Sequence, residues 1–446
     1  MLTDRYGSPL NAPDAAAVDA LHDAVTRFMR FRHGMLDPVA PWLAAGDAFP
    51  LAAALDAYIG ALSTEAGVAA ETAAAFGRAR ERCARLPLTE RERGHLDAAD
   101  RLLAGDLRGA ADLLTRLSEH DPHDMVALAA GHQVDFLRGD AVALRDRVGA
   151  VLAFLAEDDP HYPWLLGMYA FGAEENGHWE YAERLGRRAA ELDPDNVWAV
   201  HAVAHTFEER GRAEDGAAWL DGRRADWDGD NYLRLHLTWH RCLFRLDAGD
   251  AAAVLATYDA DLAPERTAGS ALEILNGSSL LWRLHLAGVD VGGRFATLAD
   301  AWRDRAADPW YAFNDWHAAL CFAGADDQAA LAALIRSREA YATGDAGSGL
   351  PDDRDVTGAV GLPVCRAIAA FAQKDYDAAV DLMMPVRHAL RRTGGSDAQR
   401  DVLQQTLIEA AVRAGRTTTA RTLLGERIAR RPAGPFDRAV RDRLGI

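Results

Sequence analysis

The sequence contains few cysteines and no long uninterrupted run of apolar residues. Cys83, Cys242, Cys321 and Cys365 are far apart in a chain of 446 residues, and none belongs to a C-x-x-C pair. This spacing excludes the common zinc and redox motifs and favours reduced core cysteines in a cytoplasmic protein. No run approaches 18 apolar residues, and no basic segment followed by an apolar one opens the chain. We therefore predict neither a membrane span nor a secretion signal.

The chain also lacks an excess of positive charge. It has 49 basic and 67 acidic residues, which gives a formal net charge of −18. A field of this sign repels phosphate backbones, so we do not expect a nucleic-acid partner. Hydrophobic residues make up 49% and charged residues 26%, a composition typical of a folded protein with a substantial core.

Small residues, glycine, alanine and proline recur with a period of 34 residues, the length of a tetratricopeptide repeat. In residues 91–122 they are Ala98, Gly105, Ala110 and Pro122. The hairpin that follows is longer by about four residues, so the phase is reset before residues 163–194, where they are Ala170, Gly177, Ala182 and Pro194. Residues 197–220 keep this phase with Ala204, Gly211 and Gly216. In such repeats, small residues let two antiparallel helices cross closely before the chain turns. The pattern predicts an all-α, right-handed α-solenoid of about six or seven helical hairpins, closed on itself by its C-terminal hairpins.

The composition along the chain predicts five segments. They are a flexible start over residues 1–13, helical hairpins over 14–90, tetratricopeptide-like repeats over 91–335, a surface loop over 336–360 and C-terminal hairpins over 361–446. The loop is predicted because residues 340–360 are rich in Gly, Asp and Ser. The first hairpins have no polar cap that we can identify, and this suggests a homodimer.

Histidines are concentrated in one part of the repeats. His201, His205 and Glu208 share one helical stripe, because residues three and four apart lie on the same face of a helix. His236 and His240 repeat the spacing in a later helix. The register places these side chains on the concave surface, with Glu175 one repeat earlier. Two histidine pairs and carboxylates on one surface indicate a metal site or an acid/base site.

Several motifs resemble those of the tetratricopeptide repeat protein 38 family. They are Tyr169–Gly172, Trp198–His205, His236–His240, Phe313–His317, Gly361–Cys365 and Gly394–Asp401. The resemblance runs from about residue 90 to residue 430 and implies an α-solenoid with a site, without naming a reaction. The positions that match the family pattern are Glu175, His201, His205, Glu208, His236, His240, Asn314, Asp315, His317, Gln399, Arg400 and Asp401. At Glu174 and Glu209 the family pattern is not acidic, so these two receive less weight.

Candidate roles follow from the chemistry of each group. His201, His205, His236 and His240 are candidate ligands for a divalent transition metal such as zinc or iron. His205, Glu208, His240 and Glu175 are candidates for acid/base catalysis. Trp164, Trp198, Trp239, His317, Asn314, Asp315 and Arg400 are candidates for contact with a ligand.

The alternatives stay open at each of these positions. Histidine pairs four residues apart are most often structural, and His236–His240 lacks the intervening glutamate of the zincin motif. Tryptophans also fill irregular helix interfaces, and Arg400 can brace the last hairpins. Two functions remain. One is hydrolase- or lyase-like chemistry on a small polar molecule, and the other is a scaffold that binds a peptide or protein in the groove.

Overall fold

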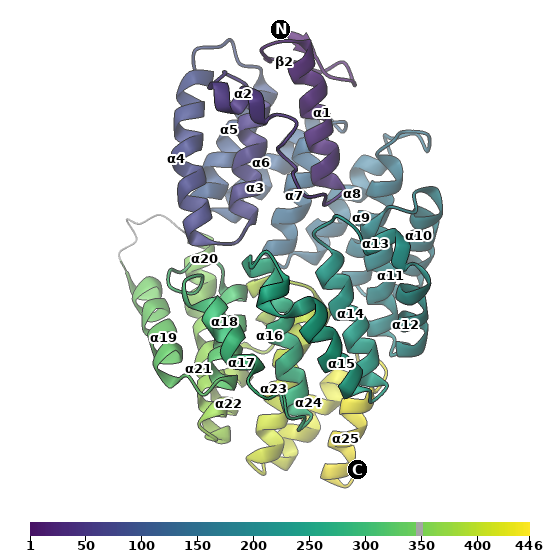
Figure 1. Ribbon diagram of the computed structural model, residues 1–446, viewed down its shortest axis with the longest axis vertical. Helices are drawn as coiled ribbons and strands as arrows, with labels where there is room; N and C mark the ends of the chain where they lie inside the picture. The colour runs from purple at the N-terminus through teal and green to yellow at the C-terminus, as the bar shows by residue number, and fades with distance from the viewer. Residues whose placement is uncertain (345–350) are drawn as a thin grey trace.

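The fold is all-helical, apart from a pair of two-residue strands in the part of the chain that the structure describes. A computed structural model describes residues 1–344 and 351–446. The N-terminal helices lie at one end of the molecule and the C-terminal helices at the other (Figure 1). The predicted all-α class and helical-repeat packing are confirmed, because consecutive helices such as α5 and α6, α7 and α8, and α9 and α10 pack on one another.

The elements have the following bounds. In the first half of the chain they are β1 (Leu2–Thr3), β2 (Pro9–Leu10), α1 (Ala15–Met29), α2 (Ala40–Ala45), α3 (Pro50–Leu62), α4 (Ala66–Cys83), α5 (Glu90–Leu103), α6 (Leu107–His120), α7 (Met125–Leu137), α8 (Ala141–Leu152), α9 (Tyr162–Glu175), α10 (Trp179–Leu192), α11 (Val197–Glu209), α12 (Ala213–Gly222) and α13 (Arg224–Trp227). In the second half they are α14 (Arg234–Asp247), α15 (Ala251–Thr257), η1 (Tyr258–Leu262), η2 (Pro264–Arg266), α16 (Ala271–Leu286), α17 (Arg294–Arg303), α18 (Ala312–Gly324), α19 (Gln328–Thr343), α20 (Pro351–Val356), η4 (Thr357–Gly361), α21 (Leu362–Ala372), α22 (Tyr376–Met383), η5 (Met384–Val386), η6 (Leu390–Thr393), α23 (Asp397–Arg413), α24 (Thr417–Ile428) and α25 (Pro435–Leu444).

A Gly-Asp pair forms the turn in several hairpins. Gly105 ends α5 with a φ of 78°, a left-handed conformation that glycine adopts without a steric penalty. The next residue, Asp106, accepts a hydrogen bond from the backbone N–H of Gly109 and so caps α6. Gly249 and Asp250 repeat this arrangement between α14 and α15. Two adjacent residues thus stop one helix and start the next.

Helix α14 joins the two large hydrophobic cores. Leu237 and Phe244 pack in the core built by the N-terminal helices, whereas Leu235 and Trp239 pack in the core built by the C-terminal helices. Burying one large apolar side chain stabilises the fold by about 1.5–3 kcal/mol. Because α14 is held on both sides, the histidines that it carries have a fixed position between the two halves of the chain.

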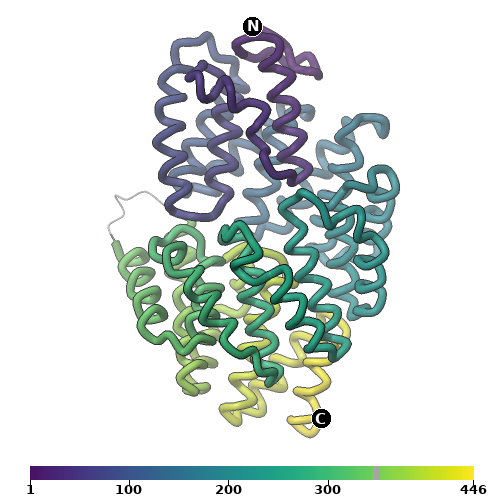
Figure 2. Tube along the Cα trace, in the orientation of Figure 1, coloured from purple at the N-terminus to yellow at the C-terminus, as the bar shows by residue number. Residues whose placement is uncertain are grey.

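The C-terminal helices pack back on the middle of the chain. The backbone N–H of Asp397, the first residue of α23, lies 3.1 Å from Oε1 of Glu175 at the end of α9. Arg431 donates a hydrogen bond of 3.2 Å to Glu209 at the end of α11. In the trace, the yellow C-terminal segment accordingly lies beside the teal middle segment (Figure 2).

The first thirteen residues are arranged differently from the predicted flexible start. β1 and β2 pair antiparallel, and Leu10 is fully buried in the N-terminal core. Ser8 donates a hydrogen bond of 2.6 Å to Asp121, and the Asn11 side chain donates one of 2.7 Å to Glu92. These polar residues satisfy groups at the ends of the neighbouring helices, a role that composition alone does not reveal.

The predicted loop over residues 336–360 is mostly helical where it is described. α19 continues to Thr343, and α20 and η4 cover residues 351–361, while residues 345–350 lie outside the described part of the chain. The buried Arg338 holds the end of α19, because its guanidinium lies 2.7 Å from Asp315 and 3.1 Å from the carbonyl oxygen of Ala307.

One helical stretch, Asp352–Ala372, is long and apolar enough to cross a membrane, with a mean hydropathy of 1.3. However, 56% of its most apolar window is buried inside the molecule. Buried core helices pass the same test of length and composition, so this stretch is weak evidence for a membrane span.

Candidate metal centre

Four imidazole rings from two helices meet in the interior. His201 and His205 come from α11, and His236 and His240 come from α14. The ring centres of His205 and His240 lie 4.5 Å apart, and those of His201 and His236 lie 5.0 Å apart. The four-residue spacing on each helix and the packing of α11 on α14 produce this cluster, as the repeat register predicts.

The Nε2 atoms point toward one another within each pair. Nε2 of His205 lies 2.9 Å from Nε2 of His201, and Nε2 of His240 lies 3.2 Å from Nε2 of His236. When one ring nitrogen is taken from each of the four histidines, these four atoms all lie within 4.8 Å of one another. At a zinc–nitrogen distance of about 2.0–2.1 Å, two ligands of a tetrahedral ion lie roughly 3.4 Å apart. Each histidine pair therefore has nearly the spacing of two ligands of one ion, and the four nitrogens together are somewhat farther apart than that.

The Nδ1 atoms point outward, and three of the four face an oxygen atom. Nδ1 of His240 lies 2.9 Å from Oε2 of Glu208, and Nδ1 of His236 lies 2.9 Å from Oδ1 of Asn276. Nδ1 of His205 lies 3.3 Å from Oε2 of Glu174. Metal-binding histidines commonly donate their second ring N–H to such an oxygen, which fixes the tautomer and the ring orientation.

Asn276 determines where the proton of His236 resides. Its amide nitrogen donates to the carbonyl oxygens of Leu272 and Glu273, at 3.2 and 3.1 Å, so Oδ1 is the atom that faces His236. An amide oxygen only accepts, and Nδ1 of His236 must therefore carry the proton. This leaves the lone pair of Nε2 directed at Nε2 of His240. Such a contact needs either a proton or a cation between the two atoms.

Burial keeps the histidines neutral. It lowers the pKa of His201, His205 and His240 well below the usual range, and the neighbouring imidazoles add to this effect. Burial lowers the pKa of His236 to about 4. At neutral pH, all four rings thus have one free lone pair each, which is the form that binds metals.

The surrounding carboxyl groups are perturbed in the opposite direction. Burial raises the pKa of Glu208 and of Glu175 to about 8, and the neighbouring acidic groups contribute. The pKa of Glu174 is also raised, first by burial and then by Glu175. Glu174 is 1% exposed, and neither of its oxygens has a hydrogen-bond partner among the described residues. Buried polar groups without partners are rare and often mark an ion-binding or catalytic site.

The histidines are buried, whereas the sequence predicts that they line the surface of a concave pocket. His201 is 3% exposed, and His205 and His240 are fully buried. The cover comes from the C-terminal helices, whose Asp397 and Arg431 contact the ends of α9 and α11. Repeat phase predicts which side of a helix faces inward, but it does not predict how deeply that side is buried.

The three predicted ligand-binding tryptophans have different surroundings. Trp239 stacks on His236, with ring centres 5.0 Å apart and nearly parallel planes. Trp198 lies 5.9 Å from His201 in an aromatic cluster with Phe171. Trp164 instead donates a hydrogen bond of 2.8 Å to Asp193. Trp239 and Trp198 thus form walls of the histidine cluster, and Trp164 has a structural contact outside it.

The predicted site residues of α18 have other contacts. His317 stacks on Trp316 and lies 2.8 Å from the carbonyl oxygen of Phe313 through Nδ1, and it contacts none of the four clustered rings within the described chain. Asn314 donates to the backbone oxygen of Thr64 at 2.8 Å, and Asp315 pairs with Arg338. The structure therefore gives all three residues structural contacts: Asn314 with the turn between α3 and α4, Asp315 with α19, and His317 within α18 itself.

Arg400 contacts both the last hairpins and the edge of the site. Its guanidinium donates 3.0 Å to the carbonyl oxygen of Gly394 and pairs with Asp397 at 2.6 Å. It also lies 3.5 Å from Oε2 of Glu175. Arg400 thus holds the start of α23 in place and faces the carboxyl group at the end of α9.

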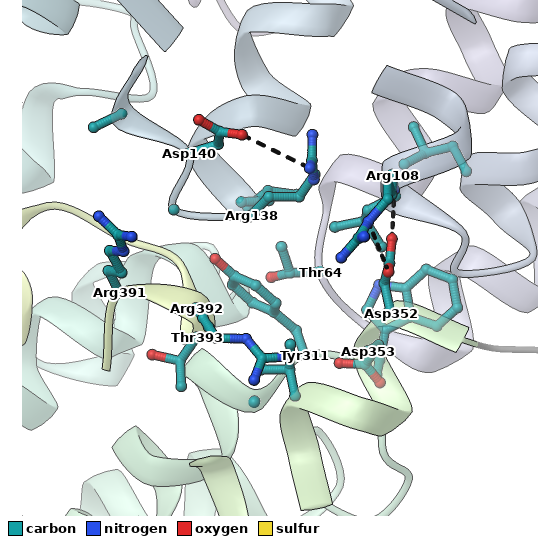
Figure 3. Close-up of a pocket in the computed structure, with 18 of the residues that line it drawn as sticks. Thr64, Arg108, Arg138, Asp140, Tyr311, Asp352, Asp353, Arg391, Arg392 and Thr393 are labelled. Carbon is teal, nitrogen blue, oxygen red and sulfur yellow. Dashed lines mark hydrogen bonds and ion pairs between the residues drawn. The ribbon is translucent and has the colours of Figure 1, made fainter. Parts of the chain in front are cut away.

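Two cavities meet at Glu175. The first, which we call the arginine cavity, has a volume of about 370 Å³ and is shown in Figure 3. Its polar lining includes Arg108, Arg138, Arg391, Arg392, Asp140, Tyr311, Asp352 and Asp353. The second, the C-terminal cavity, has a volume of about 710 Å³ and lies beside α23 and α24. Because Glu175 lines both and lies 3.8 Å from Nδ1 of His205, it separates the cavities from the histidines.

No family model matches the chain, and no solved structure matches it. The resemblance to the tetratricopeptide repeat protein 38 family consequently rests on the motifs alone.

Two residues of the site, Asn276 and Arg283, were not predicted from the sequence. Arg283 is 5% exposed, and its guanidinium lies 5.3 Å from the centre of the Trp239 ring. The sequence does not mark either residue as part of the site, because both lie on α16, in a repeat of irregular length.

Proposed function

We propose that the four histidines bind one divalent transition-metal ion, such as zinc or iron, and that the protein uses it on a small polar molecule. The observation that carries this proposal is the orientation of the rings, with the Nε2 atoms directed inward and three of the four Nδ1 atoms facing oxygens. Within each pair, the two Nε2 atoms lie 2.9 or 3.2 Å apart, where they either share one proton or would both bind one ion. Bound there, the ion would polarise a substrate or lower the pKa of a bound water.

The carboxyl groups supply the acid/base part of the proposal. Glu208 contacts His240 directly, and Glu175 lies between His205 and the two cavities. A pKa of about 8 keeps either group able to exchange a proton near neutral pH. Glu175 is the group that a molecule in either cavity would meet first. We therefore assign to it the transfer of a proton to or from the substrate, in hydrolase- or lyase-like chemistry.

We further propose that the helices form a right-handed, tetratricopeptide-like solenoid of the protein 38 type, closed by its C-terminal hairpins. The Gly-Asp turns and the 34-residue spacing support the repeat type. The contacts of Asp397 with Glu175 and of Arg431 with Glu209 support closure. In a closed solenoid, small molecules reach the interior more easily than a folded partner does. This favours a small-molecule site over the scaffold alternative.

Cobalt(II) provides a test of both binding and chemistry. We expect the metal-free protein to bind Co²⁺ with the intense visible absorption of a tetrahedral nitrogen site, and His205→Ala with His240→Ala to abolish that band. His120→Ala is the matched control, because His120 is an exposed histidine at the end of α6. A shift of the band on addition of azide would show that the ion accepts an external ligand. An unshifted band would restrict the ion to a structural role, and an unchanged band in the double variant would contradict the site.

A further inference from the structure

The arginine cavity lies where several distant segments of the chain meet. It is lined by residues from the ends of α3 and α9, the α5–α6 and α7–α8 turns, the start of α18, helix α20 and η6. Figure 3 shows Arg108, Arg138, Arg391 and Arg392 around Tyr311 and Thr64. Its volume of about 370 Å³ is within the range of small-ligand sites, roughly 300–1,000 Å³, and is too small for a folded partner.

Two of its arginines have unused hydrogen-bond donors. The carboxylate oxygens nearest to Arg138 are 3.7 Å away on Asp135 and 3.8 Å away on Asp140, beyond good hydrogen-bond distance. Asp135 is already held by Arg147 through bonds of 2.7 and 3.2 Å. The exposed side chain of Arg391 has no ion pair or hydrogen bond with the described residues. Both guanidinium groups are thus available to a ligand.

Three acidic groups of the lining have hydrogen-bond partners of their own, and the fourth, Asp353, is buried. Asp140 caps α8 by accepting from the N–H of Ala143, and Asp352 accepts 2.6 Å from the N–H of Arg108. Asp353 is 7% exposed, and burial raises its pKa to about 8. Glu175 accepts from the N–H of Asp397 and lies 3.5 Å from the guanidinium of Arg400. The guanidinium groups of Arg138 and Arg391 are therefore the charged groups of the lining that lack a close partner.

The turns that carry the two arginines are fixed against each other. Gly139 has a φ of 64°, and a β-carbon added to it would lie 1.8 Å from the carbonyl oxygen of Arg391. Gly394 has a φ of 88°, and a β-carbon there would lie 1.9 Å from the hydroxyl oxygen of Tyr311. That hydroxyl is buried and has no hydrogen-bond partner among the described residues. Rigid placement of charged groups reduces the ordering cost of binding.

We propose that the arginine cavity binds a small-molecule oxyanion, a carboxylate or a phosphate, between the guanidinium groups of Arg138 and Arg391. Guanidinium groups bind both kinds of oxyanion through paired N–H donors. The Tyr311 hydroxyl supplies a third donor on the buried side. This inference goes beyond the proposed metal centre, because the arginines do not contact the histidines and bind their ligand whether or not a metal is present. Glu175, which lines the cavity, connects the two sites.

Calorimetric titration with inorganic phosphate and, separately, with succinate tests this proposal at constant ionic strength set by sodium chloride. We expect saturable binding of at least one anion, with affinity reduced at least about tenfold in Arg138→Ala and in Arg391→Ala. Arg336→Ala is the matched control, since Arg336 is an exposed helical arginine on α19, outside the cavity lining. It should bind like the wild type. Preference for phosphate or for succinate identifies the source of the oxyanion.

Three results would overturn the proposal. They are heat without saturation for both anions, unchanged affinity in both arginine variants, and binding that disappears when the metal is removed with a chelator. The last result would place the anion on the metal and leave the metal centre intact. Retention of binding in chelator-treated protein supports the cavity even if no metal is ever found. Arg391→Gln, which is closer in size to arginine, should show the same loss as Arg391→Ala if charge is responsible.

Discussion

Glu208 of α11 and His240 of α14 are joined across two repeats, with Oε2 2.9 Å from Nδ1. The contact turns the opposite nitrogen of His240 toward His236. His236 is oriented in the same way by Asn276 from a third repeat. Three consecutive hairpins thus contribute residues to one site. The position of each helix that carries the histidines depends on its packing against the following hairpin.

Replacing Glu208 with Gln should weaken metal binding without removing a ligand. Loss of the carboxylate that orients a metal-bound histidine typically lowers affinity 10–100-fold. Competition with a chromophoric chelator measures the change. Glu214→Gln on the exposed face of α12 is the control and should leave the affinity unchanged. Equal affinities of wild type and Glu208→Gln would show that Glu208 does not orient His240.

The histidine pairs could be predicted from the sequence because they depend on local geometry. Spacing of four residues fixed the relation of His201 to His205, and repeat phase added Glu175 from the preceding hairpin. His317 was predicted to enter the site, but it stacks on Trp316. Its position depends on how several consecutive repeats curve relative to one another, and the sequence of a single repeat does not specify that curvature. The contact of Asn276 with His236 depends on that same curvature.

For the described residues on either side of 345–350, the loop prediction was wrong for a different reason. Gly, Asp and Ser are frequent in residues 340–360, yet α19 extends to Thr343 because the buried ion pair of Arg338 with Asp315 holds it. A tertiary contact of this kind outweighs a local preference of a few tenths of a kcal/mol per residue. Composition could not reveal the partner of Arg338, which lies on the preceding helix.

Asp353→Asn should stabilise the protein more at pH 8 than at pH 5. Burial raises the pKa of Asp353 in the folded state to about 8, so the unfolded chain loses the proton first as the pH rises. The wild type therefore loses stability from about pH 4 up to about pH 8, by an amount on the order of a few kcal/mol. Urea unfolding of both proteins at the two pH values measures the difference. The exposed Asp304→Asn should show no such trend, and a pH-independent difference for Asp353→Asn would contradict the assignment.

Gly139→Ala should destabilise the protein more than Gly177→Ala. Both glycines have positive φ, at 64° and 78°, so each alanine pays a conformational cost of roughly 1–2 kcal/mol. At Gly139 the added carbon also meets the carbonyl oxygen of Arg391, whereas no atom lies within 4 Å at Gly177. Thermal unfolding compares the two variants directly. Equal losses would mean that the two turns do not press against each other.

Arg427→Met should destabilise the C-terminal cover. The guanidinium of Arg427 pairs with Asp401 and Asp437, and all three side chains are buried. Removing one partner of a buried ion pair typically costs about 3–5 kcal/mol. Arg421→Met on the same helix is the exposed control and should cost less than about 0.5 kcal/mol. Chemical unfolding measures both, and similar values would show that the buried network does not hold α24 in place.

The metal content of the purified protein tests the central claim most directly. Wild type prepared without chelators, and then loaded and desalted, should contain about one transition-metal ion per chain by plasma mass spectrometry. The variant with both His201→Ala and His236→Ala, which removes one ligand from each helix, should contain almost none while keeping its helical circular dichroism spectrum. A wild type that stays metal-free after loading with zinc or iron, or a double variant that retains a full equivalent, would contradict the account.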